Sequence, residues 1–203
     1  QKPGNISFEE AAAVPLAWLT AYPAINAPLH VPPGQKILIQ AAAGGVGHLA
    51  VQFAKINGAY VFGTASEKNK QFLKSLGVDR FIDYKKEKFD EIVHDADAAL
   101  DAMGGDVLYR SIACVKHGGI VVCLPSSTKD DPKAIELAKK QDVRLIWPMM
   151  RPDGDQMQKI AELLEQKKLK VFVDKIFTFG QIVWAHKAAE THSTKGKVVV
   201  RVG

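Results

Sequence analysis

The segment from Lys36 to Lys55 joins an apolar strand, a glycine-rich turn and an amphipathic helix without a residue between them. Its turn reads A-x-G-x-x-G, with Ala42 at the position where the usual fingerprint has its first glycine. A turn of this kind holds the pyrophosphate of a dinucleotide, because glycine lets the backbone approach the phosphates and the following helix N-terminus faces the anion. The glycines alone are weak evidence, and the flanking strand and helix make the pattern specific. The predicted pyrophosphate residues are Gly44, Gly45, Val46 and Gly47.

Short apolar runs alternate with helical patterns of about ten to fifteen residues along most of the chain. This alternation predicts an α/β protein with a doubly wound parallel sheet of the Rossmann type. Glycines or charged turns separate the elements, and a capping box at Ser7 and Glu10 opens the first helix. Strands are expected at 36–40, 60–63, 80–83, 98–101, 120–124 and 143–147, with a turn at Gly118–Gly119, and helices at 8–24, 47–57, 67–76, 107–115, 132–140 and 155–167.

The C-terminal part departs from this plan. A strand at 171–179, a helix at 181–192 and a strand at 197–202 are one strand–helix–strand unit more than a six-stranded dinucleotide fold needs. The last strand is therefore expected to pair in a different sheet.

Bulk properties exclude several classes of protein. The net charge is +5, but the lysines are scattered among nearly as many acids, which favours a solvated surface that attracts small phosphorylated molecules over a nucleic-acid partner. No apolar run is long enough for a membrane span. The polar start lacks the core of a signal peptide, and Cys114 and Cys123 make no disulfide framework, so a reduced, cytoplasmic setting is expected.

The end of the second predicted strand indicates which dinucleotide fits. The tip from Thr64 to Ser66 carries no acid, and Lys68 and Lys70 follow it. An NAD site usually has a carboxylate there for the ribose hydroxyls, whereas serine and lysine suit the 2′-phosphate of NADPH. Glu67 stands one position too late for the usual acid. We therefore predict NADPH as the cofactor. Thr64 and Ser66 at the tip are predicted contacts, and Lys70 is a stronger candidate than Lys68.

Other motifs are better explained structurally. Tyr84 and Lys88 match the Y-x-x-x-K pair of short-chain dehydrogenases, but they lie in a charged turn and not on a long helix. His186 and Glu190 would share a helix face, yet no further ligand has suitable spacing for a metal. Trp147, Met149 and Met150 follow a strand end, where core packing of all three and a nicotinamide contact by one of them are equally consistent with their position.

Taken together, the motifs of this chain resemble those of the medium-chain dehydrogenases/reductases, in their zinc-independent quinone oxidoreductase branch. The resemblance runs over nearly all residues. It is carried by the segments 7–22, 41–47, 63–66, 78–84, 101–105 and 196–200 in this order and spacing.

The resemblance implies roles for individual residues. Thr20 would touch the nicotinamide end, and Met103 would lie beside the adenine-side ribose. Ser66, Lys70 and Tyr84 would hold the 2′-phosphate, and His192 would be a further basic contact. The segments expected around the nicotinamide contribute Cys123, Leu124, Ser126 and Met149.

The resemblance also implies a domain plan. Residues 1–174 would form the dinucleotide-binding domain with its leading helix, and residues 175–203 would be the tail of a barrel-like catalytic domain that lies before this sequence. Zinc-dependent relatives carry a cysteine ligand in the segment before Thr20, whereas this chain has Pro15-Leu-Ala-Trp-Leu there. A catalytic metal is therefore not expected, and a homodimer is expected for the full-length protein.

These observations predict an NADPH-dependent oxidoreductase that transfers hydride to a quinone or an enone. The proton can come from solvent, so no catalytic residue is expected in this segment. The alternatives are a zinc-free alcohol or enoyl reductase of the same superfamily and a non-catalytic nucleotide- or RNA-binding module. The acid-free tip at Thr64–Ser66 speaks against a methyltransferase.

Overall fold

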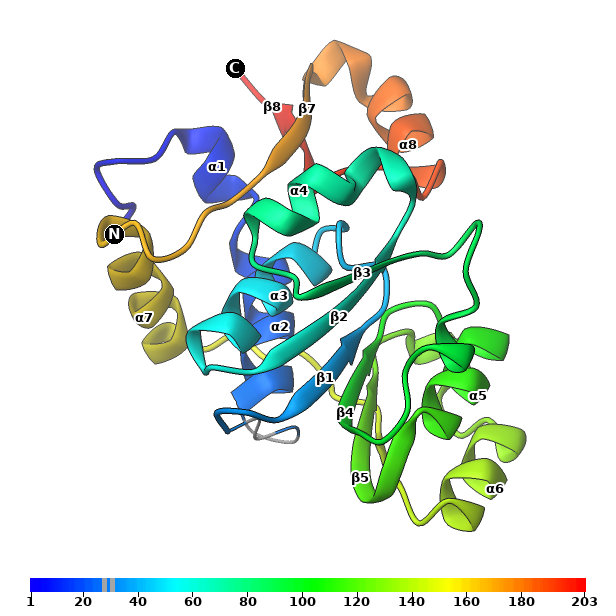
Figure 1. Ribbon diagram of the computed structural model, residues 1–203. Coiled ribbons are helices and arrows are strands. Elements are labelled where there is room, and N and C mark those ends of the chain that lie inside the picture. The colour runs from blue at the N-terminus through cyan, green and yellow to red at the C-terminus, as the bar shows by residue number, and fades with distance from the viewer. Residues whose placement is uncertain (27–28, 30–31) are drawn as a thin grey trace.

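The computed structural model describes residues 1–26, 29 and 32–203. Its core is one sheet of six strands in the order β3-β2-β1-β4-β5-β6, and every neighbouring pair is parallel (Figure 1). The order reverses beside β1, which is the switch point where doubly wound sheets bind their ligands. The predicted fold class is confirmed. The strands are β1 (Lys36–Ile39), β2 (Tyr60–Ala65), β3 (Arg80–Asp83), β4 (Ala96–Asp101), β5 (Val115–Cys123) and β6 (Arg144–Ile146).

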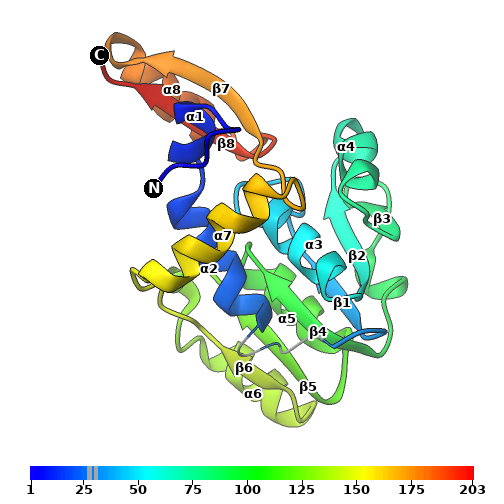
Figure 2. The ribbon, with the colours of Figure 1, turned by 90° about the vertical axis from the view of Figure 1, so that its left-hand side faces the viewer.

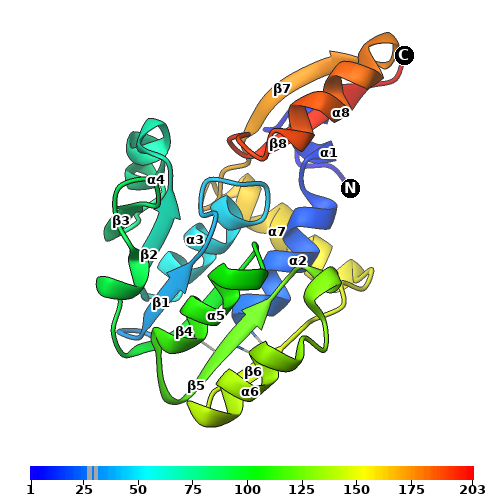
Figure 3. The ribbon, with the colours of Figure 1, turned by 90° about the vertical axis from the view of Figure 1, so that its right-hand side faces the viewer.

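Helices cover both faces of the sheet, because successive side chains of a strand point to opposite sides. Along β1, Ile37 and Ile39 belong to one hydrophobic core and Leu38 to the other. Helices α2, α3 and α7 pack over the first core, and α5 and α6 over the second (Figure 3). The helices are α1 (Phe8–Ala12), α2 (Pro15–Asn26), α3 (Gly47–Ile56), α4 (Lys70–Ser75), α5 (Gly105–Ala113), α6 (Pro132–Lys140) and α7 (Gly154–Glu165).

Two expectations about local structure are wrong. The N-terminal helix is two helices: Ser7 caps α1 as predicted, but Pro15 has no N–H to continue that helix and instead begins α2. The turn expected at Gly118–Gly119 lies inside β5. A Cβ on Gly119 would lie 2.9 Å from the Asp97 carbonyl oxygen, so glycine there allows close approach to β4 rather than a chain reversal.

The C-terminal unit forms a second sheet of its own. Strands β7 (Val173–Thr178) and β8 (Lys197–Arg201) pair in parallel, with helix α8 (Ile182–Glu190) between them, and they lie with α1 above the six-stranded sheet (Figure 2). Arg201 Nε donates to Glu9 Oε1 at 3.0 Å and links β8 to α1. The last strand thus pairs in a different sheet, as expected. Of the helices described, none has the length and apolar character needed to cross a bilayer.

Candidate cofactor-binding site

The glycine turn between β1 and α3 leaves no space for a side chain at its last glycine. A Cβ on Gly47 would lie 2.8 Å from the Ala42 Cα and would overlap the Ala41 carbonyl oxygen. The Gly44 N–H donates to that same carbonyl at 2.9 Å, and Ala41 adopts a left-handed conformation with φ of +50°. The close packing of α3 on β1 therefore depends on glycine at position 47.

The N-terminal end of α3 is open to an anion. Among the described residues, the N–H groups of Gly45, Val46 and Gly47 have no protein acceptor, and Val46 provides no side-chain cap. Unpaired N–H groups at the N-terminus of a helix, together with the positive end of the helix dipole, form the arrangement that binds phosphate groups. The turn therefore fits the pyrophosphate of a dinucleotide.

Two residues of the C-terminal unit, Gly196 and Lys197, contact the glycine turn. The Gly196 N–H donates to the Ala43 carbonyl at 2.9 Å. The aliphatic stem of Lys197 crosses the turn at Gly45, where its Cδ lies 2.7 Å from the position of a Cβ. Gly45 has no positive φ, so its glycine makes room for the Lys197 stem instead of relieving backbone strain.

His48 joins the turn to the chain that enters β7. Its Nδ1 lies 2.9 Å from the Gly44 carbonyl oxygen, and the Phe172 N–H donates to its Nε2 at 3.4 Å. This pattern assigns the proton to Nδ1, because Nε2 acts as an acceptor. Burial lowers the pKa of His48 to about 4, so the ring is neutral near pH 7.

A chain of buried polar side chains supports the strand ends below the site. Thr64 Oγ1 accepts from the Ala41 N–H at 3.1 Å and donates to Gln40 Oε1 at 2.7 Å. Gln40 Nε2 donates to Ser111 Oγ at 3.1 Å, and Ser111 Oγ lies 3.4 Å from Asp101 Oδ2. Burial raises the pKa of Asp101, although the N–H groups of the following loop act in the opposite direction.

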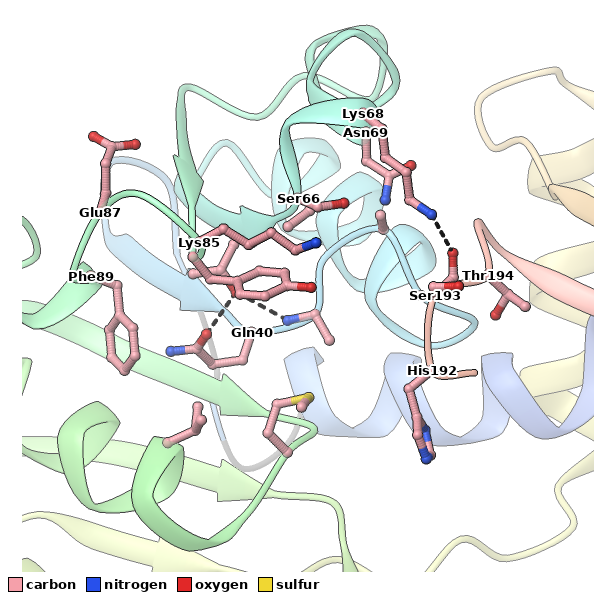
Figure 4. A pocket seen from close by; sticks show the side chains of 18 of the residues that line it. Gln40, Ser66, Lys68, Asn69, Lys85, Glu87, Phe89, His192, Ser193 and Thr194 are labelled. Atoms are coloured by element: carbon pink, nitrogen blue, oxygen red, sulfur yellow. Dashed lines mark hydrogen bonds between the residues drawn. The ribbon is translucent and has the colours of Figure 1, made fainter. Parts of the chain in front are cut away.

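A cavity of about 280 Å³ lies over the carboxyl ends of β1, β2 and β3 and beside the start of α5 (Figure 4). Five residues predicted from the sequence line it: Gly44, Thr64, Ser66, Tyr84 and Met103. Lys68 and His192, which the sequence indicated only as weaker contacts, also line the cavity. Most of the other lining residues were not predicted, and they include Gln40, Lys85, Glu87, Phe89, Val107, Arg110, Ser193 and Thr194.

The charges around this cavity differ from the sequence-based prediction. Lys68 and Lys85 line it, whereas Lys70 does not. The Lys70 ammonium lies 3.2 Å from Glu67 Oε1, and the other Glu67 oxygen lies 3.7 Å from Lys86. Glu67 is outside the cavity lining and engaged by two lysines, so it does not occupy the position of an NAD-selective acid.

Among the described residues that line the cavity, Glu87 is the one carboxylate, and its negative charge is paired with Arg80. Its Oε1 accepts from Arg80 at 2.6 Å and its Oε2 accepts from the Asp83 N–H at 3.1 Å. The hydrogen bond from the Asp83 N–H lowers the pKa of Glu87, and the hydrogen bond from Arg80 lowers it by a smaller amount. In Figure 4, the Glu87 carboxylate points away from Lys85 and Ser66.

The remaining predicted contacts lie outside the cavity lining. Thr20 donates to the Leu16 carbonyl within α2 at 2.7 Å. Cys123 is fully buried, and burial raises the pKa of its thiol. Leu124 and Ser126 directly follow β5, and Met149 follows β6 and is 76% exposed. These last three share the carboxyl edge of the sheet with the cavity, one and two strands beyond β4.

Within residues 1–26, 29 and 32–203, no group of three or more histidine, cysteine, aspartate or glutamate side chains is arranged to hold a metal ion. His186 and Glu190 therefore have no third ligand of these types in the described structure.

Comparison with known proteins identifies the family. Residues 76–200 match the family model described as zinc-binding dehydrogenase. The chain belongs to this family. Its relatives place it in the quinone oxidoreductase branch of the medium-chain dehydrogenases/reductases.

Three similar proteins illustrate the relationship. A quinone oxidoreductase structure from Coxiella burnetii superposes with a TM-score of 0.94 at 38% identity, over 100% of this chain and 63% of that one. A probable zinc-binding oxidoreductase, mitochondrial, from Arthroderma benhamiae is 34% identical over 100% of this chain and 65% of its own length. An NADPH-dependent alkenal/one oxidoreductase, chloroplastic, from Arabidopsis thaliana is 34% identical over 98% and 48%. The chain thus spans about half to two thirds of the length of these relatives.

Proposed function

We propose that this chain is the cofactor-binding part of an NADPH-dependent oxidoreductase that transfers hydride to a quinone or an enone without zinc. The observation that carries the proposal is the cavity beside the open α3 N-terminus, which lysines border and where the β2 tip has no carboxylate. It is supported by membership of an oxidoreductase family and by relatives whose names specify a quinone or NADPH with an alkenal or enone.

The residues would divide the work of holding the cofactor. The N–H groups of Gly45, Val46 and Gly47 would bind the pyrophosphate, and Ser66 and Tyr84 would face the 2′-phosphate. Met103 would lie beside the adenosine. The segments after β5 and β6, with Cys123, Leu124, Ser126 and Met149, would border the nicotinamide, toward which Thr20 would point from α2.

Bound NADPH supplies the hydride, and the protein orients it and excludes water. No catalytic acid is assigned to this chain, because a reduced quinone or enone can take its proton from solvent. The absence of a cysteine from Pro15 to Leu19 supports a zinc-independent reaction.

The domain plan and the oligomeric state of the full-length protein are proposed on the same basis. Residues 175–203 would belong to a catalytic domain with residues 1–174 as the cofactor domain, and the whole protein would be a homodimer. The two curated relatives are named for a mitochondrion and a chloroplast, so the cytoplasmic location stays a prediction.

The direct test is titration of the chain with NADPH and with NADH, with nicotinamide fluorescence as the measure of binding. We expect NADPH to bind at least tenfold more tightly, with a difference that shrinks at high salt because a charged phosphate is involved. Equal affinities, or binding of neither cofactor, would refute the proposed cofactor specificity. For the full-length protein, quinone reduction that persists after dialysis against a zinc chelator tests the metal-free reaction.

A further inference from the structure

The lysines around the cavity differ in their partners and therefore in their freedom to bind a phosphate. Four lysines, Lys68, Lys70, Lys85 and Lys86, lie near the ends of β2 and β3, and position after the second strand favours Lys70. The structure separates them into two pairs. Lys68 and Lys85 line the cavity, and Lys70 and Lys86 meet at the carboxylate of Glu67 outside it.

Lys85 is the lysine with the most freedom to bind a ligand. Its ammonium has no hydrogen-bond or ion-pair partner in the part of the chain that the structure describes, and its side chain extends along the cavity toward Ser66 (Figure 4). Its backbone is fixed, because the Lys85 N–H donates to Asp83 Oδ1 at 3.1 Å. A fixed backbone with an unengaged ammonium over a cavity is what a phosphate contact requires.

Lys68 approaches from the opposite side. Its ammonium donates to the Ser193 carbonyl at 3.2 Å, which places it at the boundary between the six-stranded sheet and the C-terminal unit. Ser66 lies between the two lysines in Figure 4, and it is only 8% exposed. Two cations on either side of a hydroxyl suit a phosphate monoester, which carries up to two negative charges.

Lys70, unlike Lys85, is engaged by a neighbouring carboxylate, that of Glu67. This carboxylate holds Lys70 at 3.2 Å, three residues further along the chain, and Lys70 also lies over the Phe81 ring, 5.7 Å from its centroid. Both contacts must be broken or shared before Lys70 can reach a phosphate over the cavity.

We propose that Lys85 and Lys68 hold the 2′-phosphate of the cofactor, and that Glu67 withholds Lys70 from it. This inference rests on the proposed NADPH specificity and names the residues that determine it. It also predicts that the discrimination against NADH is limited by Glu67 and can be increased by removing its charge.

The test compares NADPH and NADH dissociation constants for Lys85→Gln, Lys68→Gln and Lys70→Gln, with adenosine 2′,5′-bisphosphate and 5′-AMP as probes of the adenosine half. Lys74→Gln is the matched control, because Lys74 is exposed on the same helix as Lys70 and does not line the cavity. We expect Lys85→Gln to weaken NADPH and the bisphosphate about tenfold, Lys68→Gln three- to tenfold, and Lys70→Gln or Lys74→Gln less than threefold. NADH and 5′-AMP should change less than twofold throughout.

A double-mutant cycle tests Glu67. We expect Glu67→Gln to tighten NADPH two- to fivefold, and Lys70→Gln to become more costly in that background, because the freed ammonium can then reach the phosphate. A tenfold loss in Lys70→Gln with an unchanged Lys85→Gln would overturn the inference while leaving the proposed function intact. If the unmodified chain does not prefer NADPH, the proposed function itself fails.

Discussion

Gly47 packs directly against the backbone of Ala42, since a Cβ on this glycine would lie 2.8 Å from the Ala42 Cα. The obstructing atoms belong to the main chain of the turn, so no rotation of a side chain can make room. Any larger residue must move the start of α3 away from β1, and the N–H groups of Gly45 and Val46 move with it. Helix packing and the proposed pyrophosphate binding therefore depend on the same contact.

We predict that Gly47→Ala lowers the free energy of unfolding by about 1–3 kcal/mol, as overpacking does in other cores, and weakens NADPH binding. Urea unfolding and cofactor titration measure the two effects. Gly154→Ala is the control, because no atom lies within 4 Å of its Cβ position at the first turn of α7. Equal free energies of unfolding for the two variants would contradict this role of Gly47.

Gly45 and Lys197 form a pair that makes a different prediction. Because the obstruction at Gly45 is the flexible stem of Lys197, Gly45→Ala should cost no more than about 1 kcal/mol of stability. Most of that cost should disappear in the Lys197→Ala background, which removes the obstructing methylenes. Additive effects of the two substitutions in denaturant titrations would contradict this assignment.

The pattern of the sequence predicts the fold well because its main determinants are local. Alternating apolar runs and the capped helix at 132–140, whose bounds match α6, depend on residues close in sequence. The turn expected at Gly118–Gly119 was wrong because the pair lies inside β5, where Gly119 packs closely against the neighbouring strand β4, and sequence spacing does not reveal this contact.

The site was predicted less completely, for a related reason. Ser66 and Tyr84 follow strand ends, so topology alone brings them to one cavity. Which lysine lines that cavity depends on side-chain partners. Lys70 forms an ion pair with Glu67 outside the lining, whereas Lys85 lies in it. The spacing of three between Glu67 and Lys70 was a readable signal for that ion pair. The direction of Lys85 had no such signal.

The buried hydroxyl of Thr64 is predicted to stabilise the fold, because it links the Ala41 N–H to the Gln40 side chain. Thr64→Val removes the acceptor of the Ala41 N–H and the donor to Gln40, leaving a part-buried N–H and a buried amide oxygen unpaired. We expect a loss of about 1–3 kcal/mol in the free energy of unfolding. Ser75→Ala, which removes an exposed hydroxyl, should change it by less than about 0.5 kcal/mol. Equal losses in the two variants, measured by urea unfolding, would contradict the role given to this hydroxyl.

The exposed apolar side chains of the C-terminal unit should behave as an unpartnered surface in this chain. Phe179, Val183 and Trp184 are each about 60% exposed, at 62%, 61% and 62%. Val183→Glu combined with Trp184→Glu should reduce binding of a hydrophobic dye and raise solubility, with little loss of stability because both side chains are already solvated. A large drop in the melting temperature would show that these side chains pack within the chain itself.

His48 should make the stability of the chain depend on pH. Its pKa is about 4 in the folded chain, whereas an unburied histidine has a pKa near 6.5. Between these values the unfolded chain takes up a proton that the folded chain does not, so the free energy of unfolding falls as the pH is lowered from 6.5 to 4. The full difference corresponds to about 3 kcal/mol, and this residue adds nothing further below pH 4.

His48→Gln does not titrate and can still donate to the Gly44 carbonyl. The stability difference between the original chain and His48→Gln should therefore shrink or reverse across this pH range, while the carboxylates common to both cancel. A difference that stays constant from pH 7 to pH 4 in urea unfolding would show that His48 takes up its proton equally well in both states.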